Sequence, residues 1–171
     1  MWGVGTNLVT GNPQPALDGV YKLSALKSAE GKWQYKLKLS EQLAKISNPG
    51  RLQVKRFSQG GEHFADIIYD IDQGINLGLQ SVDPFDPTKS IHISEDFESK
   101  DLLVPIFREG VQVYTSPSLQ EIRSEARLEI QKLPVGVKRF LNPHLYPVGM
   151  QKDLYDRKVE LIKKVRSGIN R

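Results

Sequence analysis

The chain has 171 residues, of which 39% are apolar and 26% are charged, and its formal net charge is +4. This length suits one compact domain, and the composition is typical of a globular protein rather than a disordered chain. The absence of cysteine excludes disulfides and thiolate metal sites. No apolar run approaches the ~20 residues that a membrane span needs, so we expect a cytoplasmic protein with no membrane partner.

The small excess of positive charge raises the question of nucleic-acid binding. Lysines alternate with apolar residues in KWQYKLK at 32–38, and this alternation is typical of a half-buried strand with one solvated face. The basic tail beyond Arg157 includes Glu160 at helical spacing from its lysines, which favours a solvent-facing helix. We therefore expect no nucleic-acid partner and keep a basic nucleic-acid module only as the least favoured hypothesis.

The first half of the chain predicts strands joined by short turns. Apolar residues alternate with polar ones in four runs, near 19–27, 32–40, 51–57 and 63–71. Small and polar residues at 27–31 suit a hairpin loop between the first two runs, and SQGG at 58–61 suits a turn between the last two. The four runs are expected to form one mainly antiparallel sheet.

The middle of the chain gives weaker signals. Residues 72–100 contain two prolines and many aspartates and serines, which indicates a loop, with a short edge strand at 91–93. The apolar run at 102–107 is interrupted by Pro105, which a strand tolerates only at a sheet edge or at a strand end.

Two helices are predicted in the C-terminal third. Ser118 and Glu121 have the spacing of a capping box at the start of a helix near 118–132. Apolar residues then recur at intervals of three and four and form one stripe: Leu119, Ile122, Ala126, Ile130 and Leu133. A second helix is expected near 152–166, with Tyr155, Val159 and Ile162 on one side and Gly168 placed to end it.

Three segments, in order and spanning most of the chain, resemble nicotinate phosphoribosyltransferases. The first comprises residues 2–10, WGVGTNLVT, with QPAL at 14–17 and GVYKL at 19–23. It is similar to the family's loop after the last barrel strand and to the segment that leaves the barrel. The second comprises KLSE at 38–41 and KISNPG at 45–50, and the third is LNPHLYPVG at 141–149.

The resemblance implies the fold class and the domain organisation. It implies an α+β chain, with a mainly antiparallel β-rich domain followed by C-terminal helices, as the terminal piece of a larger α/β-barrel enzyme. We expect a remnant of the barrel's phosphate-binding loop and exit segment at 1–18, the β-rich domain at 19–115, and a helical segment at 116–171. The missing N-terminal barrel portion is then a partner, and a homodimer is left open.

The resemblance also implies a phosphate site at the first motif. Gly3 and Gly5 would let backbone N–H groups converge on the 5′-phosphate without obstruction by Cβ, the hydroxyl of Thr6 would add a hydrogen bond, and Asn7 is a weaker candidate. Taken alone, a Gly-x-Gly-Thr pattern favours a merely flexible segment. Together with the other two segments it favours the phosphate site.

The family's reaction joins nicotinate to phosphoribosyl pyrophosphate, giving nicotinate mononucleotide in NAD synthesis, with ATP hydrolysis. The histidine that the family phosphorylates and the basic residues that hold nicotinate precede this segment in the family. No catalytic residue is therefore expected here, and the isolated chain is expected to be inactive. ATP and magnesium are implied for the full enzyme, while no cofactor is expected on this fragment. The alternative is a non-catalytic accessory or interaction domain.

The other residues that could take part in catalysis or metal binding are interpreted as structural or solvent-facing. The three histidines lie far apart without metal-ligand spacing, so no metal site is expected, and His144 between two prolines is interpreted as a structural hydrogen-bonding residue. No Gly-x-Ser-x-Gly pattern indicates a nucleophile. Asp66, Asp70 and Asp72 are interpreted as solvent-facing residues at a strand end.

Overall fold

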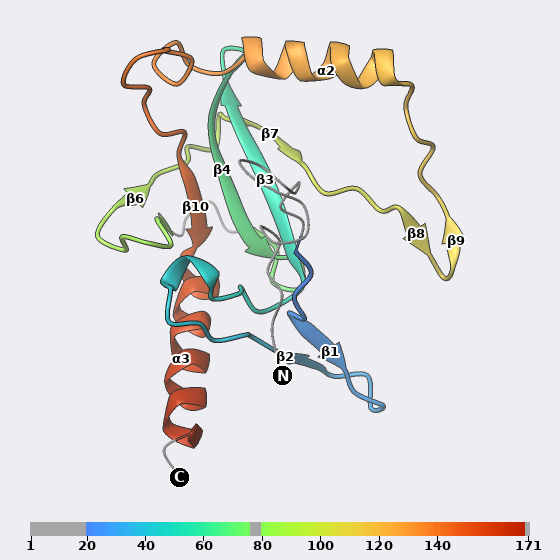
Figure 1. Ribbon diagram of the computed structural model, residues 1–171, viewed down its shortest axis with the longest axis vertical. Helices are drawn as coiled ribbons and strands as arrows, with labels where there is room; N and C mark the ends of the chain where they lie inside the picture. Colours follow the sequence, from blue (N-terminus) through green and yellow to red (C-terminus); the bar gives the residue numbers. More distant parts are fainter. Residues whose placement is uncertain (1–19, 76–79, 170–171) are drawn as a thin grey trace, which may run out of the picture.

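The computed structural model describes residues 20–75 and 80–169, and its centre is a six-stranded sheet (Figure 1). The strand order is β6-β5-β10-β4-β3-β7, and only the β10–β4 pair is parallel. Two helices accompany the sheet, so the predicted α+β class is confirmed. The strands of this sheet are β3 (Leu52–Gln59), β4 (Glu62–Asp70), β5 (Ser81–Val82), β6 (Ser90–Ile91), β7 (Glu98–Asp101) and β10 (Val148–Gln151).

The hairpin of β3 and β4 is the longest paired unit, and it confirms two of the predicted strands. Its turn is formed by Gly60 and Gly61, whose φ angles are +58° and +82°. Two consecutive positive φ angles match the twist of the flanking strands, and glycine adopts them at low cost. The register shifts by one residue within the hairpin, because Phe57 pairs with Ala65 while Ser58 pairs with His63. Phe64 is therefore a β-bulge.

The strand β10 was not predicted, and it brings the C-terminal third of the chain into the sheet. It lies between β4 and β5 and continues directly into α3 (Lys152–Ile169). Gly149 permits this close approach, since a Cβ there would lie 2.9 Å from Cδ1 of Ile67 and 3.0 Å from Cδ1 of Ile91. A four-residue strand containing glycine carries little local signal, and only its long-range pairing makes it a strand.

The prediction of one sheet for the first four strands is wrong. Strands β1 (Ala25–Lys27) and β2 (Trp33–Tyr35) pair antiparallel as predicted, but they form a separate two-stranded sheet and are shorter than expected. Residues 36–51, which include the 3₁₀ helix η1 (Leu43–Lys45), separate this hairpin from β3. The edges of β3 are already taken by β4 and β7, so the first hairpin has no edge of β3 to join.

The region predicted as loop contains β7 at one sheet edge, and β6 includes one residue of the expected edge strand. The apolar run at 102–107 is not a strand until its last residue, where β8 (Phe107–Arg108) begins. It pairs with β9 (Val111–Gln112) in a third small sheet, across a turn in which Glu109 and Gly110 have φ angles of 50° and 80°.

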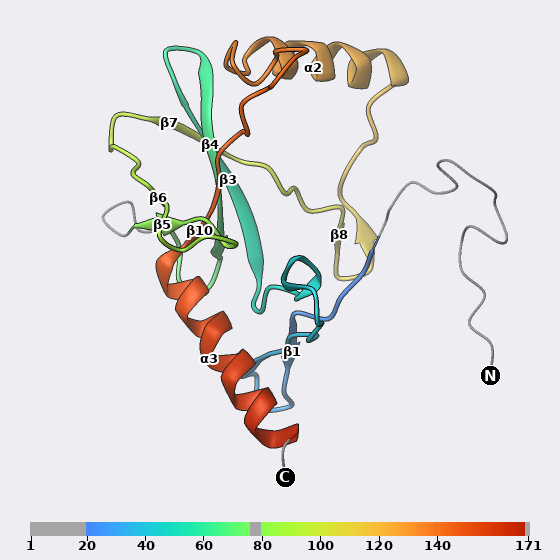
Figure 2. The same ribbon diagram turned by 60° about the vertical axis from the view of Figure 1, so that its left-hand side comes forward.

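Both predicted helices are present. In α2 (Leu119–Gln131) the hydroxyl of Ser118 accepts from the backbone of Glu121, and the carboxylate of Glu121 accepts from the backbone of Ser118, so the capping box is confirmed. The helix α3 is longer than expected and runs through Gly168, which does not end it. The C-terminal end of helix α2 lies beside the turn end of the β3–β4 hairpin and the rest of the helix projects away from it, while α3 extends from the opposite end of the sheet (Figures 1 and 2).

The core lies where α3 meets the sheet at β10. Its fully buried side chains include Phe57, Ile67, Met150 and Leu154. The apolar stripe predicted for α2 faces no core among the described residues, since Leu119 is 71% exposed and Ile130 is 56% exposed. Residues 102–131 form an arm that swings away from the sheet and carries β8, β9 and α2 (Figure 2). The stripe is a real feature of the sequence, but its partner is not in the described part of the chain.

Candidate functional site

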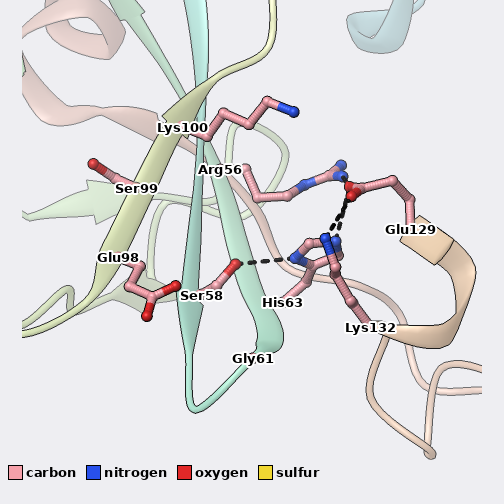
Figure 3. Close-up of a pocket in the computed structure, with 9 residues that line it drawn as sticks. All are labelled: Arg56, Ser58, Gly61, His63, Glu98, Ser99, Lys100, Glu129 and Lys132. Carbon is pink, nitrogen blue, oxygen red and sulfur yellow. Dashed lines mark hydrogen bonds and ion pairs between the residues drawn. The ribbon is translucent and has the colours of Figure 1, made fainter. Parts of the chain in front are cut away.

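A polar pocket of about 200 Å³ lies between the β3–β4 hairpin, β7 and the C-terminal end of α2 (Figure 3). Strand β3 contributes Arg56 and Ser58, and β4 contributes His63. Helix α2 contributes Glu129, followed by Lys132 at its end. Glu98, Ser99 and Lys100 of β7 and Gly61 of the hairpin turn complete the lining. Its charged side chains come from three regions that are far apart in the sequence: the β3–β4 hairpin, β7 and the end of α2.

Arg56, which lines the pocket, forms an ion pair with Asp66. They are cross-strand partners in the hairpin, and the guanidinium donates from Nε to Oδ1 and from Nη2 to Oδ2, both at 2.8 Å. Tyr146 donates its phenol hydroxyl to Oδ1 of the same carboxylate at 3.0 Å. The bidentate contact with Asp66 raises the pKa of Arg56, and burial together with the Asp66 charge raises the pKa of Tyr146. Both groups keep their protons at neutral pH.

Glu129 joins α2 to the hairpin. Its Oε2 accepts from Nη1 of Arg56 at 3.0 Å and lies 3.0 Å from Nε2 of His63, while its Oε1 accepts from Lys132 at 2.9 Å. The hydrogen bond from Lys132 and the nearby positive charges lower the pKa of Glu129 to about 2, against the opposing effect of burial. The carboxylate is therefore ionised at neutral pH and holds the end of α2 in place.

The bulge at Phe64 explains how His63 reaches this network. In an unbroken strand, side chains alternate between faces, but the extra residue shifts the alternation between Ala65 and His63. His63 and Arg56 consequently meet the same oxygen of Glu129. The ring of Phe64 stacks on that of Phe97, with centroids 4.8 Å apart, which gives the bulged residue its own anchor.

Ser58, His63 and Glu129 lie in series, with 3.0 Å between Oγ of Ser58 and Nδ1 of His63. This order resembles that of a nucleophile, a base and an acid, and sequence analysis did not find it because Glu129 is far from the other two. Both oxygens of Glu129 are already engaged by cations, and His63 is only 5% exposed. The arrangement links the end of α2 to the hairpin, and we call Ser58, His63 and Glu129 the polar tie.

Lys100 is different from the other cations of the pocket. Its side chain extends from β7 toward the cluster (Figure 3), and within 20–75 and 80–169 no carboxylate pairs with its ammonium group. Glu98, two residues earlier on the same strand, also lines the pocket, so this side of it carries one charge of each sign.

The interpretation of the β4 aspartates as solvent-facing is wrong for two of the three. Asp66 is 8% exposed and Asp70 is 2% exposed, and Asp70 accepts from Nη1 of Arg157 at 2.9 Å. Only Asp72, paired with Arg51, lies beyond the strand and remains exposed. The returning C-terminal segment pairs with the free edge of β4 as β10, and the residues before and after β10 supply Tyr146 to Asp66 and Arg157 to Asp70.

His144 packs against the turn after α2. Its backbone N–H donates to the carbonyl of Gly136 at 2.9 Å, and a Cβ at position 136 would lie 2.4 Å from its Nδ1. This contact supports the structural role predicted for His144. Among the described residues, no group of three His, Asp or Glu side chains could hold a metal ion, and no helix is long and apolar enough to cross a membrane.

The predicted phosphate-binding residues Gly3, Gly5, Thr6 and Asn7 lie outside the described residues, as does the whole of segment 1–18. The phosphate site therefore stays a prediction from the sequence. The domain boundaries near 18 and 115 also stay predictions.

Comparison with known proteins identifies the family. The family model for the nicotinate phosphoribosyltransferase C-terminal domain matches residues 51–158 of the sequence. This range contains the whole β3–β4 hairpin, the polar tie and β10. The chain belongs to the nicotinate phosphoribosyltransferase family. The resemblance noted in the sequence is therefore confirmed.

Relatives within this family show how much of the protein the chain represents. A nicotinate phosphoribosyltransferase from Bacillus subtilis is 32% identical over 173 residues, covering 99% of this chain and 35% of that protein. One from Caenorhabditis elegans is 32% identical over 159 residues, covering 90% of this chain and 27% of that protein. The chain thus spans roughly a third of the length of these nicotinate phosphoribosyltransferases.

A solved structure shares the fold. The crystal structure of human nicotinic acid phosphoribosyltransferase superposes with a TM-score of 0.60 at 20% identity, over 76% of this chain and 27% of that one. Most of this chain therefore has the fold of a part of that structure.

Proposed function

We propose that this chain is the C-terminal domain of a protein that joins nicotinate and phosphoribosyl pyrophosphate to give nicotinate mononucleotide, with hydrolysis of ATP. The observation that carries the proposal is the family match over residues 51–158. In the whole protein the ring nitrogen of nicotinate bonds to C1 of the phosphoribosyl group, and the bond from C1 to pyrophosphate breaks. The transition state gains positive charge on the sugar, so positioning and electrostatic stabilisation are the main tasks of the protein.

The part of this task that we assign to the chain is a phosphate cradle at Gly3, Gly5 and Thr6. The assignment rests on the sequence motif and on the physics of glycine-rich loops, in which backbone N–H groups converge on an anion. In (β/α)₈ barrels, phosphate sites are frequently built by the loops after strands seven and eight. Magnesium is implied for the full enzyme, but the described residues offer no carboxylate cluster that fits it, so we assign it no step here.

The exposed arm supports the need for a further portion of the protein. Leu119 of α2, Phe107 of β8 and Val111 of β9 are each more than 60% exposed, and further apolar residues of the arm are exposed as well. Apolar side chains exposed in such number on one segment indicate an interaction site. We infer that the catalytic barrel portion covers it, and that the isolated chain is inactive.

The test is a chimera in which this chain replaces the matching C-terminal third of the Bacillus subtilis relative. The chimera should form nicotinate mononucleotide from nicotinate, phosphoribosyl pyrophosphate and ATP, whereas the isolated 171-residue chain should form none. In the same chimera, Gly5→Ala should weaken binding of phosphoribosyl pyrophosphate about tenfold or more and leave the melting temperature nearly unchanged, because a Cβ obstructs the phosphate. Gly60→Ala, in a hairpin turn far along the chain, is the matched control and should leave affinity intact.

Three results would contradict the proposal. Turnover by the isolated chain would show that catalytic residues lie within it. A folded chimera with unimpaired substrate binding after Gly5→Ala would remove the phosphate cradle from that residue. A chimera that folds and self-associates through the arm but forms no nicotinate mononucleotide would favour the alternative of a non-catalytic accessory domain or a homodimerisation module.

A further inference from the structure

A second pocket, of about 360 Å³, lies at the other end of the molecule between α3, η1 and the loop at 83–89. This volume falls within the range of small-molecule sites, which are concave, mostly apolar and furnished with a few polar groups. Helix α3 provides one wall, with Tyr155, Lys158, Val159, Ile162, Lys163 and Arg166. The opposite wall consists of Leu43, Ile46, Pro84, Phe85 and Pro87.

The α3 wall is one face of the helix. Its residues recur at spacings of three and four, so their side chains stand one above the other along the same side. The apolar stripe that the sequence places on this helix, with Tyr155, Val159 and Ile162, therefore lines a pocket and is not fully packed in the core. All three side chains are only partly buried.

The opposite wall is held in a defined conformation. The carboxylate of Asp83 accepts from the backbone N–H groups of Phe85 and Asp86 at 2.8 and 3.2 Å. Asp86 in turn accepts from Thr88 and pairs with Lys89 at 3.2 Å. These local bonds form turns that hold the backbone at Phe85, whose side chain is 66% exposed. The wall is thus prepared to meet an apolar ring without a large ordering cost.

The charge of the pocket is entirely positive. Lys158, Lys163 and Arg166 line it, no carboxylate does, and none of the three forms an ion pair with another described residue. The C-terminal carbonyls of a helix favour cations near Arg166, but Lys158 lies in the first half of α3. Burial lowers the pKa of Lys158, whose ammonium donates to Oδ1 of Asn48 at 2.8 Å. A cation kept in this position at the expense of its hydration favours an anionic ligand.

We propose that this pocket binds a small aromatic carboxylate. The ring would lie between Phe85 and the Tyr155–Val159–Ile162 face, and the carboxylate would reach Lys163 and Arg166 at the mouth. The inference rests on the pocket alone and does not depend on the proposed function. It applies to the 171-residue chain, whose α3 and loop 83–89 supply every lining group except Leu43 and Ile46.

The test is calorimetric titration of the 171-residue chain with 2-naphthoate and with its neutral isostere 2-naphthamide. Naphthoate should bind at least tenfold more tightly than naphthamide. The double variant Lys163→Gln with Arg166→Gln should abolish this preference while leaving naphthamide binding unchanged. The matched control is Lys32→Gln with Lys164→Gln, which removes the same net charge from exposed residues that do not line the pocket. Phe85→Ser should weaken both ligands.

Each other outcome overturns the proposal. Equal affinity for the two ligands would show that the cations do not recognise the carboxylate. A loss of naphthoate affinity in the control as large as in the double variant would show that the cations act only through general surface charge. Absence of binding by either ligand at millimolar concentration would mean that the pocket takes no small aromatic molecule. If sedimentation shows a dimer that dissociates in the Lys163→Gln, Arg166→Gln variant, the pocket is covered by a second copy of the chain.

Discussion

The two buried aspartates of β4 each hold one arginine, yet their surroundings differ. Asp66 faces Arg56 across the hairpin and also accepts from Tyr146, whereas Asp70 pairs with Arg157 of α3 and touches the turn at Gly50. Buried ion pairs contribute little net stability compared with apolar residues, but removal of one partner leaves an uncompensated charge. Each pair therefore makes the fold sensitive to a single substitution.

Arg56→Met should lower the free energy of unfolding by about 2–4 kcal/mol, because Asp66 would keep its charge in a nearly buried position. Urea denaturation of the isolated chain measures this change. Arg123→Met on the exposed face of α2 is the control and should change stability by less than ~0.5 kcal/mol. A further Asp66→Asn in the Arg56→Met background should restore part of the loss; a loss as small as that of the control would show that Asp66 is well solvated.

Gly50→Ala should destabilise the fold more than Gly60→Ala, although both residues have positive φ. Gly50 has a φ of +111°, and its Cβ would lie 3.1 Å from Oδ2 of Asp70, while Gly60 has open space around it. Backbone strain is about 1–2 kcal/mol at the left-handed helical φ of Gly60; the φ of Gly50 lies outside that well, and only Gly50 adds the contact with a buried carboxylate. Thermal unfolding of the two variants shows which one is less stable. Equal melting temperatures would mean that the Asp70 side chain moves aside at no cost in stability.

Among the residues that the structure describes, those that hold helix α2 to the sheet contact its C-terminal end. Its N-terminus is closed by its own capping box, its apolar stripe is exposed, and its C-terminal end is tied to the hairpin through Glu129. The backbone N–H of His63 also donates to the carbonyl of Lys132 at 2.8 Å. The position of the helix thus depends on a few charged and polar contacts, which makes it responsive to acid.

Acid should release α2 from the hairpin. The pKa of Glu129 is lowered from 4.5 to about 2 in the folded state, so its contribution is fully present above pH 4.5 and is lost as the pH falls toward 2. NMR signals of α2 should shift over this window while those of β3 and β4 lag behind. In Glu129→Gln the α2 signals should already differ at neutral pH and should titrate less. Coincident loss of helix and sheet signals would show that the helix is not a separate unit.

At the scale of the whole molecule, the arm at 102–131 carries a helix face that no described segment covers, although the end of this helix is tied to the hairpin through Glu129. A single exposed apolar residue is ordinary, but a helix whose apolar stripe faces solvent has lost the packing that normally stabilises it. The comparisons show that the relatives are about three times longer than this chain, so most of such a protein lies outside it. The arm is the surface best suited to meet that remainder.

Phe107→Asp should change the free energy of unfolding of the isolated chain by less than ~0.5 kcal/mol, because the side chain is already 64% exposed. In the chimera with the Bacillus subtilis relative, the same change should lower the melting temperature by several degrees, since it would place a charge in an apolar contact. Phe57→Ala is the contrasting control: at 1% exposure it should cost about 3–5 kcal/mol in both proteins. If Phe107→Asp leaves the melting temperature of the chimera unchanged, the arm is exposed in the chimera as well.

The sequence by itself determined the family, the α+β class, the β3–β4 hairpin with its glycine turn, and α2 with its capping box. Each of these depends on patterns local to the chain, such as alternation, cap spacing and turn chemistry, or on three segments in a recognisable order. Local patterns also located the apolar stripes of α2 and α3 correctly, without showing what would face them.

Only the tertiary structure decided how distant segments combine. The return of the C-terminal third as β10 turned β4 into a central strand, and this buried Asp66 and Asp70 against Tyr146 and Arg157. One bulged residue, Phe64, brought His63 to Glu129, and the edges already taken on β3 kept the first hairpin out of the main sheet. Burial, strand neighbours and ion pairs depend on contacts between residues far apart in the sequence, and periodicity along one segment carries no information about them.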